Sequence, residues 1–290
     1  MLYYMLVKFV KGDHSMTILQ AAILGLVQGL AEFLPVSSSG HLLLTRMIMG
    51  ISDETGAYIM LDVLLHAGTL LAVIIVFWKD WWAILKNPFR SKTLLLLFIA
   101  SLPALLVVVL FGDIVDQFFT GWFLGVSFLV TAVFLLIAEW VSGKQTRRTS
   151  KPDFKHAIAM GTMQAIALLP GVSRSGSTLT GGLLSGLDRK SGAKFAFMMS
   201  APAIVGSLLF EAKDAIEEGY LAQLELVPTI VGMVVAAVSG YLAIRFMLRL
   251  INKVSLNWFA LYVALLGLII LTLQLIGVPG IPAFAFPALG

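Results

Sequence analysis

The sequence predicts an all-α polytopic membrane protein with an inverted-topology repeat, each half a re-entrant helical hairpin plus three transmembrane helices. Three observations lead to this fold class. The chain is 59% hydrophobic and only 12% charged, whereas a soluble domain carries roughly 25% charged residues. Six apolar runs are long enough to cross a bilayer. Two further apolar segments are interrupted in the middle and resemble each other in sequence.

The six apolar runs each approach the ~20 residues that a spanning helix needs. They lie at about 59–78, 93–111, 121–141, 195–210, 226–246 and 256–276. The interrupted segments, 17–50 and 156–187, contain Pro, Ser and Gly at their centres. Each half of an interrupted segment is too short to cross alone, and irregular backbone is tolerated at membrane depth only where it lines a protein-enclosed cavity. These two segments are therefore expected to be re-entrant hairpins.

A constant spacing of 136 positions relates the two hairpins. The matching pairs are Gly25 and Gly161, Gln28 and Gln164, Ala31 and Ala167, Ser37 and Ser173, Ser39 and Ser175, and Gly40 and Gly176. The chain is therefore expected to contain two repeats, about 17–141 and 156–276, within one membrane domain at 16–290. Residues 1–15 form an N-terminal extension, because their apolar run is too short to span.

Loop charges alternate along the crossings and predict the orientation. The loops at 79–92, 142–155 and 245–253 are rich in Lys and Arg, whereas 112–120 and 211–225 are acidic. If the basic loops face the cytoplasm, the first hairpin opens toward the outer side, the second toward the cytoplasm, and both termini lie outside.

The first hairpin combines acid–base and anion-binding groups. Gln28 and Glu32 are four residues apart and share one helix face, and Pro35 ends that helix. The run Ser37, Ser38, Ser39 and Gly40 then opens a second helix, expected from His41 to Met49. Serines at a helix start cap free N–H groups, and those groups attract anions.

The second hairpin repeats the break but places Arg174 where the first has Ser38. Its break and second helix contain Ser173, Arg174, Ser175, Gly176 and Thr178. Arginine binds phosphate through two parallel hydrogen bonds. The two hairpins together predict a phosphate-handling site, with Ser38 and Glu32 from one half and Arg174 from the other.

Purely structural roles remain open for these residues. Ser and Gly in membrane helices often serve helix packing. Glu32 and Arg174 could form only an ion pair, and His41 could be a hydrogen-bonded core histidine. Asp62 and His66 share one helix face and are either a support for the site or a buried pair; Gln164 is expected to be structural. The absence of cysteine excludes disulfides and thiolate metal sites.

The two motifs resemble those of a known family. Gln28 to Glu32 followed by Pro-Val-Ser-Ser-Ser-Gly-His at 35–41, and Pro-Gly-Val-Ser-Arg-Ser-Gly at 170–176, are similar to the signature regions of the bacterial undecaprenyl-diphosphatases, the BacA/UppP family. The resemblance covers nearly the whole chain from Met16 onward. It implies hydrolysis of undecaprenyl diphosphate to the monophosphate and inorganic phosphate, which recycles the lipid carrier for peptidoglycan synthesis and confers bacitracin resistance.

The resemblance also implies residue roles. Ser38 matches the proposed nucleophile, Glu32 the essential carboxylate, His41 a proposed acid or base, and Arg174 the diphosphate-binding arginine. The diphosphate would further contact Ser37, Ser39, Gly40, Ser173, Ser175, Gly176 and Thr178. The family is known to depend on Mg²⁺ or Ca²⁺, which Glu32 and Gln28 would hold, although many members have a second glutamate in place of Gln28.

Other implied properties are a multi-pass location in the bacterial inner membrane, an active site facing the periplasmic side, contact with membrane lipids, no nucleic-acid partner, and a possible homodimer.

Two other functions compete with the diphosphatase activity. A polyprenyl-phosphate transporter or flippase is the main alternative, because inverted repeats with broken helices are typical of transporters. The phosphatidic-acid phosphatase superfamily shares a Ser-Gly-His element, but no histidine follows His156 in this chain.

Overall fold

The computed structural model describes residues 16–51, 57–144, 148–217 and 225–284. Within these ranges the chain is helical, and one isolated parallel bridge joins Thr149 to Leu187. The helices are α2 (Ile18–Phe33), α3 (Ser38–Met49), α4 (Ala57–Val76), α5 (Trp78–Lys86), η1 (Pro88–Arg90), α6 (Lys92–Phe118), α7 (Leu124–Lys144), α8 (Phe154–Ile166), α9 (Arg174–Ser185), α10 (Arg189–Glu217), α11 (Leu226–Leu250) and α12 (Asn257–Leu275). The N-terminal extension predicted at 1–15 lies outside the described residues.

The predicted all-α, multi-pass part of the fold class is confirmed. Among the described residues, α6, α7, α10, α11 and α12 are long and apolar enough to cross a membrane. A sixth crossing is reached when α4 and α5 are taken together as one span bent by 79°. The chain is therefore a multi-pass helical membrane protein.

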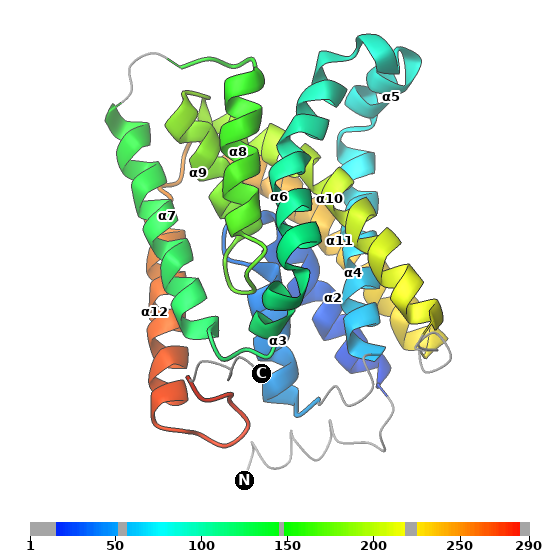
Figure 1. Cartoon of the computed structure of the whole chain (residues 1–290), viewed down its shortest axis with the longest axis vertical. Helices are drawn as coiled ribbons and strands as arrows, with labels where there is room; N and C mark the ends of the chain where they lie inside the picture. The colour runs from blue at the N-terminus through cyan, green and yellow to red at the C-terminus, as the bar shows by residue number, and fades with distance from the viewer. Residues whose placement is uncertain (1–15, 52–56, 145–147, 218–224, 285–290) are drawn as a thin grey trace.

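Each interrupted segment folds as a pair of short helices, α2 with α3 and α8 with α9. Figure 1 shows the first pair in the lower half of the molecule and the second in the upper half, with their connecting turns facing each other near the middle. α2 begins and α12 ends at the same, lower end. The two hairpins thus enter the molecule from opposite ends, as predicted.

Local sequence explains where the hairpin helices begin and end. The Thr17 hydroxyl accepts the N–H of Gln20, and the Gln20 side chain accepts the N–H of Thr17, which together form a capping box at the start of α2. α2 ends at Phe33, and its C-cap Leu34 has extended backbone because it precedes Pro35, which disfavours helical backbone in the residue before it. α3 ends at Met49, and its C-cap Gly50 has a φ of 65°, which glycine readily adopts.

Several predicted boundaries were wrong. The predicted loops at 211–225 and 245–253 begin within helices, because α10 continues to Glu217 and α11 to Leu250. α3 begins at Ser38 rather than at His41, because Ser37 caps the helix. The predicted loop at 79–92 contains α5 and η1, because its tryptophans and leucine line one side of a helix. The predicted loop at 112–120 is mostly the end of α6, which continues past a kink at Phe111 (φ −138°, ψ 19°) to Phe118.

Close contacts between small residues hold the hairpins against the long helices. A Cβ added to Gly25 of α2 would lie 2.3 Å from the carbonyl oxygen of Gly232 in α11. A Cβ added to Gly161 of α8 would lie 2.5 Å from the carbonyl oxygen of Ala100 in α6. These helices approach backbone to backbone, as small residues permit in membranes. The two contacts occupy matching places in the two halves, which agrees with an inverted repeat; the repeat relation and the division into two repeats stay predictions.

We expect Gly25→Ala to destabilise the protein by about 1–3 kcal/mol, because the added methyl group would push α2 away from the α11 backbone. Thermal unfolding in detergent measures this change. Gly143→Ala in α7 is the control, since nothing lies within 4 Å of the added carbon. A melting temperature for Gly25→Ala equal to that of the control would contradict the close packing of α2 on α11.

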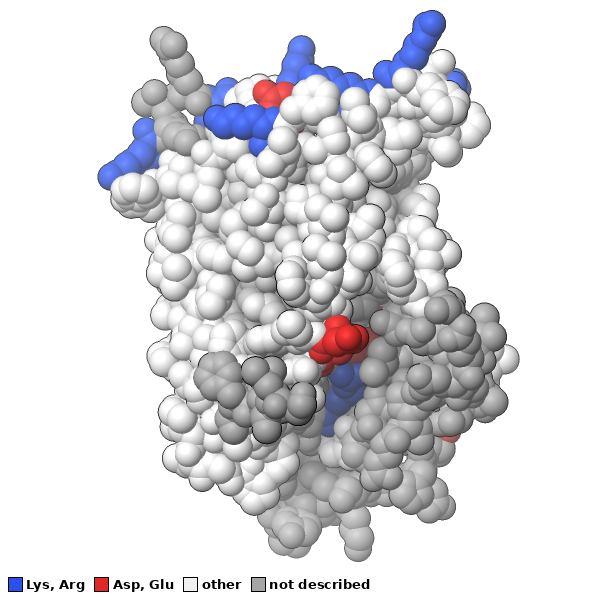
Figure 2. Space-filling view, viewed as in Figure 1, with Lys and Arg blue, Asp and Glu red and all other residues white. Residues whose placement is uncertain are grey.

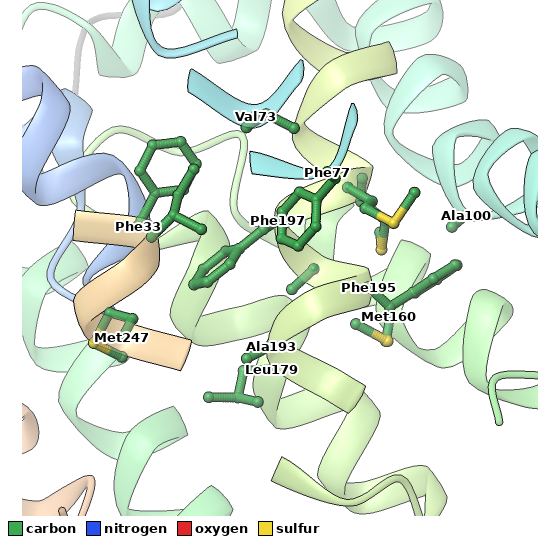
Figure 3. Packing of buried hydrophobic residues seen from close by; sticks show 14 of the residues in the cluster. Phe33, Val73, Phe77, Ala100, Met160, Leu179, Ala193, Phe195, Phe197 and Met247 are labelled. Carbon is green, nitrogen blue, oxygen red and sulfur yellow. The ribbon is translucent and has the colours of Figure 1, made fainter. Parts of the chain in front are cut away.

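Buried aromatic residues pack beside the end of α2. The rings of Phe33 and Phe197 meet edge to face, with centroids 5.4 Å apart, and Phe77 belongs to the same cluster. Figure 3 shows Phe33 and Phe77 on either side of Phe197. Phe33 is 1% exposed and follows Glu32 directly, so this cluster fixes the end of α2 that carries the glutamate.

The charged residues are unevenly distributed. Figure 2 shows Lys and Arg side chains gathered at the upper end, above a broad band with neither acidic nor basic side chains. In the lower half of this face a recess contains acidic and basic side chains. The upper end is formed by the segments that the sequence analysis singled out as basic. Of the acidic loop predicted at 211–225, residues 211–224 lie outside the part of the chain whose side chains are described.

Candidate active site at the meeting point of two broken helices

Glu32 is the centre of the site. Its side chain is 4% exposed and lies at the end of α2. One carboxylate oxygen, Oε1, accepts a hydrogen bond from the Arg174 guanidinium. The other, Oε2, accepts the Ser38 hydroxyl at 2.5 Å and the Gln28 amide at 3.2 Å. A buried carboxylate needs such partners to remain charged, so the three predicted residues around Glu32 form one hydrogen-bonded group.

The two hairpins touch at three places around this group. Besides the ion pair between Arg174 and Glu32, the Ser175 hydroxyl donates to the carbonyl oxygen of Leu34 at 2.9 Å. A Cβ added to Gly40 would lie 2.9 Å from the Cα of Gly171. Glycine is required at position 40 by this close approach. The predicted meeting of the two breaks is thus an observed feature of the structure.

Each hairpin presents the N-terminus of a helix to this meeting point, and the two caps are alike. The Ser37 hydroxyl accepts the N–H of Gly40 at 3.3 Å, and the Ser173 hydroxyl accepts the N–H of Gly176 at 3.1 Å. Hydroxyl pairs lie beside the caps, Ser37 with Ser39 at 3.4 Å and Ser173 with Ser175 at 3.3 Å. Two helix N-termini that face one site create a favourable environment for a polyanion.

Ser37 adopts an unusual backbone conformation. Its φ is 74° and its ψ is 104°, whereas the equivalent Ser173 has an ordinary φ of −68°. Residues other than glycine rarely adopt positive φ, and such strained residues concentrate at functional sites. The strain lies directly before Ser38 and marks the first hairpin as the more constrained of the two.

Threonines support the turn that carries Arg174. Thr131 of α7 accepts the N–H of Ser173 at 2.9 Å and donates to the carbonyl oxygen of Gly171 at 3.0 Å. Thr178 donates to the carbonyl oxygen of Arg174 at 2.7 Å. In the described residues the Thr178 hydroxyl therefore serves the helix backbone, and its predicted contact with diphosphate stays a prediction.

His41 forms no described hydrogen bond with the Glu32 group. One ring nitrogen, Nδ1, is 2.7 Å from the carbonyl oxygen of Ser37, and the other, Nε2, is 2.7 Å from the Tyr262 hydroxyl. The two rings stack with centroids 5.7 Å apart. Since a carbonyl oxygen only accepts, Nδ1 carries the proton and Nε2 accepts the Tyr262 hydroxyl in the neutral ring. An acid–base role for His41 stays a prediction, and it would act beside Tyr262.

His66 extends the group from α4. Its Nε2 is 3.7 Å from Glu32 Oε2, and its Nδ1 is 2.7 Å from the carbonyl oxygen of Asp62. The Asp62 carboxylate pairs with Arg46 at 2.5 Å. Of the two open interpretations for Asp62 and His66, the support role fits His66, whereas the Asp62 carboxylate forms an ion pair with α3.

Gln28 offers one free oxygen ligand. Its Oε1 is buried and has no hydrogen-bond partner among the described residues. Within those residues no cluster of three or more His, Cys, Asp or Glu side chains could enclose a metal ion. Glu32 and Gln28 are therefore two side chains with at most three oxygen ligands between them. A divalent cation fits here only if phosphate oxygens or water complete its coordination, which is the usual arrangement for Mg²⁺. Gln164, the counterpart of Gln28, is 3% exposed and also has an unpartnered Oε1.

Sequence reasoning missed Tyr262, Thr131 and Arg46. Tyr262 is 221 positions from His41, and no local pattern connects the two. Thr131 lies within an ordinary apolar run. Arg46 could have been found from the sequence, because a cation within an apolar membrane segment requires an anionic partner.

Fold and site together define a class of protein: a polytopic membrane protein in which two broken helices enclose a carboxylate, a hydroxyl and a guanidinium. The chain belongs to the bacitracin resistance protein BacA family, whose pattern matches residues 21–269. It is 42% identical over 261 residues to the undecaprenyl-diphosphatase of Carboxydothermus hydrogenoformans, with 89% of this chain and 98% of that relative covered.

Two other similar proteins are also undecaprenyl-diphosphatases by name. The undecaprenyl-diphosphatase 4 of Bacillus thuringiensis strain Al Hakam is 43% identical over 260 residues, covering 88% of this chain and 97% of the relative. The undecaprenyl-diphosphatase of Thermodesulfovibrio yellowstonii is 39% identical over 255 residues, covering 88% and 96%. The resemblance identified from the two motifs is confirmed.

Proposed function

We propose that this chain is an undecaprenyl-diphosphate phosphatase, which hydrolyses undecaprenyl diphosphate to undecaprenyl phosphate and inorganic phosphate. The observation that carries the proposal is the Ser38 hydroxyl hydrogen-bonded to Glu32, whose other carboxylate oxygen is paired with Arg174. A nucleophile beside its base and a phosphate-binding cation are thereby assembled at two helix N-termini. Membership of the family and the names of the relatives support the same activity.

In the first step the Ser38 oxygen attacks the terminal phosphorus. The Ser38 proton passes to Glu32, a bond forms between Ser38 and the phosphorus, and the bond from phosphorus to the bridging oxygen breaks. Undecaprenyl phosphate leaves with that oxygen. Water then hydrolyses the phosphoserine, releasing inorganic phosphate and restoring the Ser38 hydroxyl.

Arg174 has a second task in this scheme. A diphosphate that binds Arg174 competes with Glu32 for the guanidinium, so substrate binding would free the carboxylate to accept the Ser38 proton. The N-termini of α3 and α9, together with Ser173 and Ser175, would stabilise the negative charge on the phosphoryl oxygens. Charge neutralisation of this kind is the main requirement of phosphoryl transfer.

A divalent cation, Mg²⁺ or Ca²⁺, would be held by Glu32 and by the unpartnered Oε1 of Gln28, with substrate oxygens as further ligands. When bound it would neutralise charge on the diphosphate.

The proposed location is the bacterial inner membrane with the site facing the periplasmic side, because α2 and α3 enter from the end opposite the basic segments. A homodimer stays a prediction.

The test is phosphate release from undecaprenyl diphosphate by the purified chain in detergent. We expect activity that chelation of divalent cations abolishes, and a loss of at least about 10³-fold in Arg174→Ala, since one charged group aimed at the transition state contributes on this scale. Arg245→Ala, at an exposed position of α11, is the control. Because detergent contains no sealed compartment, phosphate release would also separate the enzyme from a pure flippase. Full activity in Arg174→Ala would remove the site proposed here.

A further inference from the structure

One amphipathic element has no place in the catalytic scheme. α5 follows a 79° bend after α4 and runs across the direction of that helix, and η1 comes directly after it. They lie at the upper end of the molecule (Figure 1), where Figure 2 shows Lys and Arg side chains gathered. The element therefore lies near the edge of the apolar band, where a membrane surface would meet the protein.

The side chains of α5 divide into three faces. One face packs on the protein: Ile84 is buried, and Asp80 pairs with Lys194 of α10 at 2.6 Å. A second face is apolar and exposed, and it continues into η1. It consists of Trp78 at 56%, Trp82 at 55%, Leu85 at 68% and Phe89 at 103% exposure. Exposed aromatic and aliphatic groups in such a row mark an interaction surface.

The third face is cationic. Lys79 and Lys86 are exposed, and their spacing of seven residues places both on the helix face next to the apolar row. Arg90 is exposed in η1. The Lys86 ammonium lies 5.6 Å from the centre of the Trp82 ring, and at the same end of the molecule Lys144 lies 4.0 Å from the Trp140 ring. Tryptophan beside lysine is typical of the boundary between hydrocarbon and headgroups.

A polar hollow adjoins the cationic face. A cavity of about 220 Å³ lies between α5, η1 and the start of α6, and its lining includes Asn87, Arg90, Ser91 and Thr93. Asp80 also lines it, but its charge is balanced by Lys194. The α5 residues of its lining, Asp80, Ala83, Ile84 and Asn87, lie on the side of the helix away from Trp78, Trp82 and Leu85. The hollow therefore offers hydrogen-bond donors and the Arg90 cation to a polar group that approaches from the side of α5 opposite the apolar row.

We propose that α5 and η1 form a binding site for anionic phospholipid. Trp78, Trp82, Leu85 and Phe89 lie among the acyl chains, and Lys79, Lys86 and Arg90 bind the headgroup phosphate. The charge complementarity selects the occupant: three exposed cations flank the apolar row, and each cation near an anionic membrane contributes about fivefold to binding. The site is separate from the Glu32 group and does not depend on the function proposed above.

The experiment is native mass spectrometry of the full-length chain in detergent, titrated with phosphatidylglycerol or with phosphatidylcholine of the same acyl chains. We expect the wild type to retain phosphatidylglycerol preferentially. In the triple variant Lys79→Gln, Lys86→Gln and Arg90→Gln, the ratio of bound phosphatidylglycerol to bound phosphatidylcholine should fall by at least about tenfold. Added salt should lower the same ratio in the wild type. The control triple, Lys151→Gln, Lys155→Gln and Lys253→Gln, removes the same charge from exposed positions elsewhere on the basic segments.

The outcomes are distinct. Retained preference in the control and lost preference in the α5 triple support the site. An equal loss of lipid preference in both triple variants would show that only total charge matters, and it would overturn the proposed site. An α5 triple variant with unchanged lipid preference would overturn the site as well. A dimer in the wild type that the α5 triple alone dissociates would assign this face to a second copy of the chain. Quenching of tryptophan fluorescence by brominated phosphatidylglycerol gives a second readout, which Trp78→Phe with Trp82→Phe should reduce.

Discussion

Glu32→Gln is expected to reduce phosphate release by about 10³-fold, because an amide cannot accept the Ser38 proton. The substitution preserves the shape of the side chain and one acceptor oxygen for the Ser38 hydroxyl. It removes the negative charge that pairs with Arg174 and the second carboxylate oxygen. Initial rates at saturating undecaprenyl diphosphate, divided by the concentration of folded protein, measure the effect.

A loss of stability must be separated from the loss of chemistry, since breaking a buried ion pair can destabilise a protein by about 3–5 kcal/mol. The chain offers a matched control in Glu139→Gln. Glu139 pairs with Arg189 at 2.5 Å, and the carboxylate is 24% exposed; it also accepts the N–H of Leu256. Both variants should melt at lower temperature, but only Glu32→Gln should lose activity per folded molecule. Comparable activity in the two variants would show that Glu32 is a structural partner of Arg174 and nothing more.

The hairpins could be predicted from the sequence because their determinants are local. Pro35 and the serines after it end one helix and cap the next within a few residues, and the same pattern recurs 136 positions later. The identity of the site followed from the same stretches, because a carboxylate and a guanidinium in interrupted membrane helices require each other. The contact between Arg174 and Glu32 agrees with that argument.

The contacts that could not be predicted depend on tertiary packing. Tyr262 of α12 meets His41 of α3 where both helices pack beside α7, whose Phe128 ring contacts the His41 ring. A tyrosine in an apolar run has no distinguishing pattern. The density of charges at 79–92 predicts a loop, whereas α5 forms a helix there because Trp78, Trp82 and Leu85 follow helical spacing. The positive φ of Ser37 could not be predicted from the sequence, since the equivalent Ser173 lies in a nearly identical sequence context and has an ordinary φ.

Ser38→Ala is expected to reduce phosphate release by a similar factor, about 10³-fold, if the reaction passes through a phosphoserine. The structure gives a reason to single out this hydroxyl. Ser38 is the first residue of α3 and the one serine of the first break whose hydroxyl donates to Glu32 in the described structure, at 2.5 Å. Its proton therefore has a defined acceptor, and its oxygen lies where the N-terminus of α3 attracts the phosphate.

Ser39→Ala is the matched control, because the Ser39 hydroxyl contacts Ser37 at 3.4 Å and forms no bond to Glu32 among those described. We expect this variant to keep activity within about tenfold of the wild type. Acid quenching of the wild type with substrate labelled in its terminal phosphate should leave label on the peptide that contains Ser38, and Ser38→Ala should abolish that label. Near-full phosphate release by Ser38→Ala would mean instead that Glu32 activates a water molecule for direct attack, and the role of Ser38 would be limited to holding the carboxylate in place.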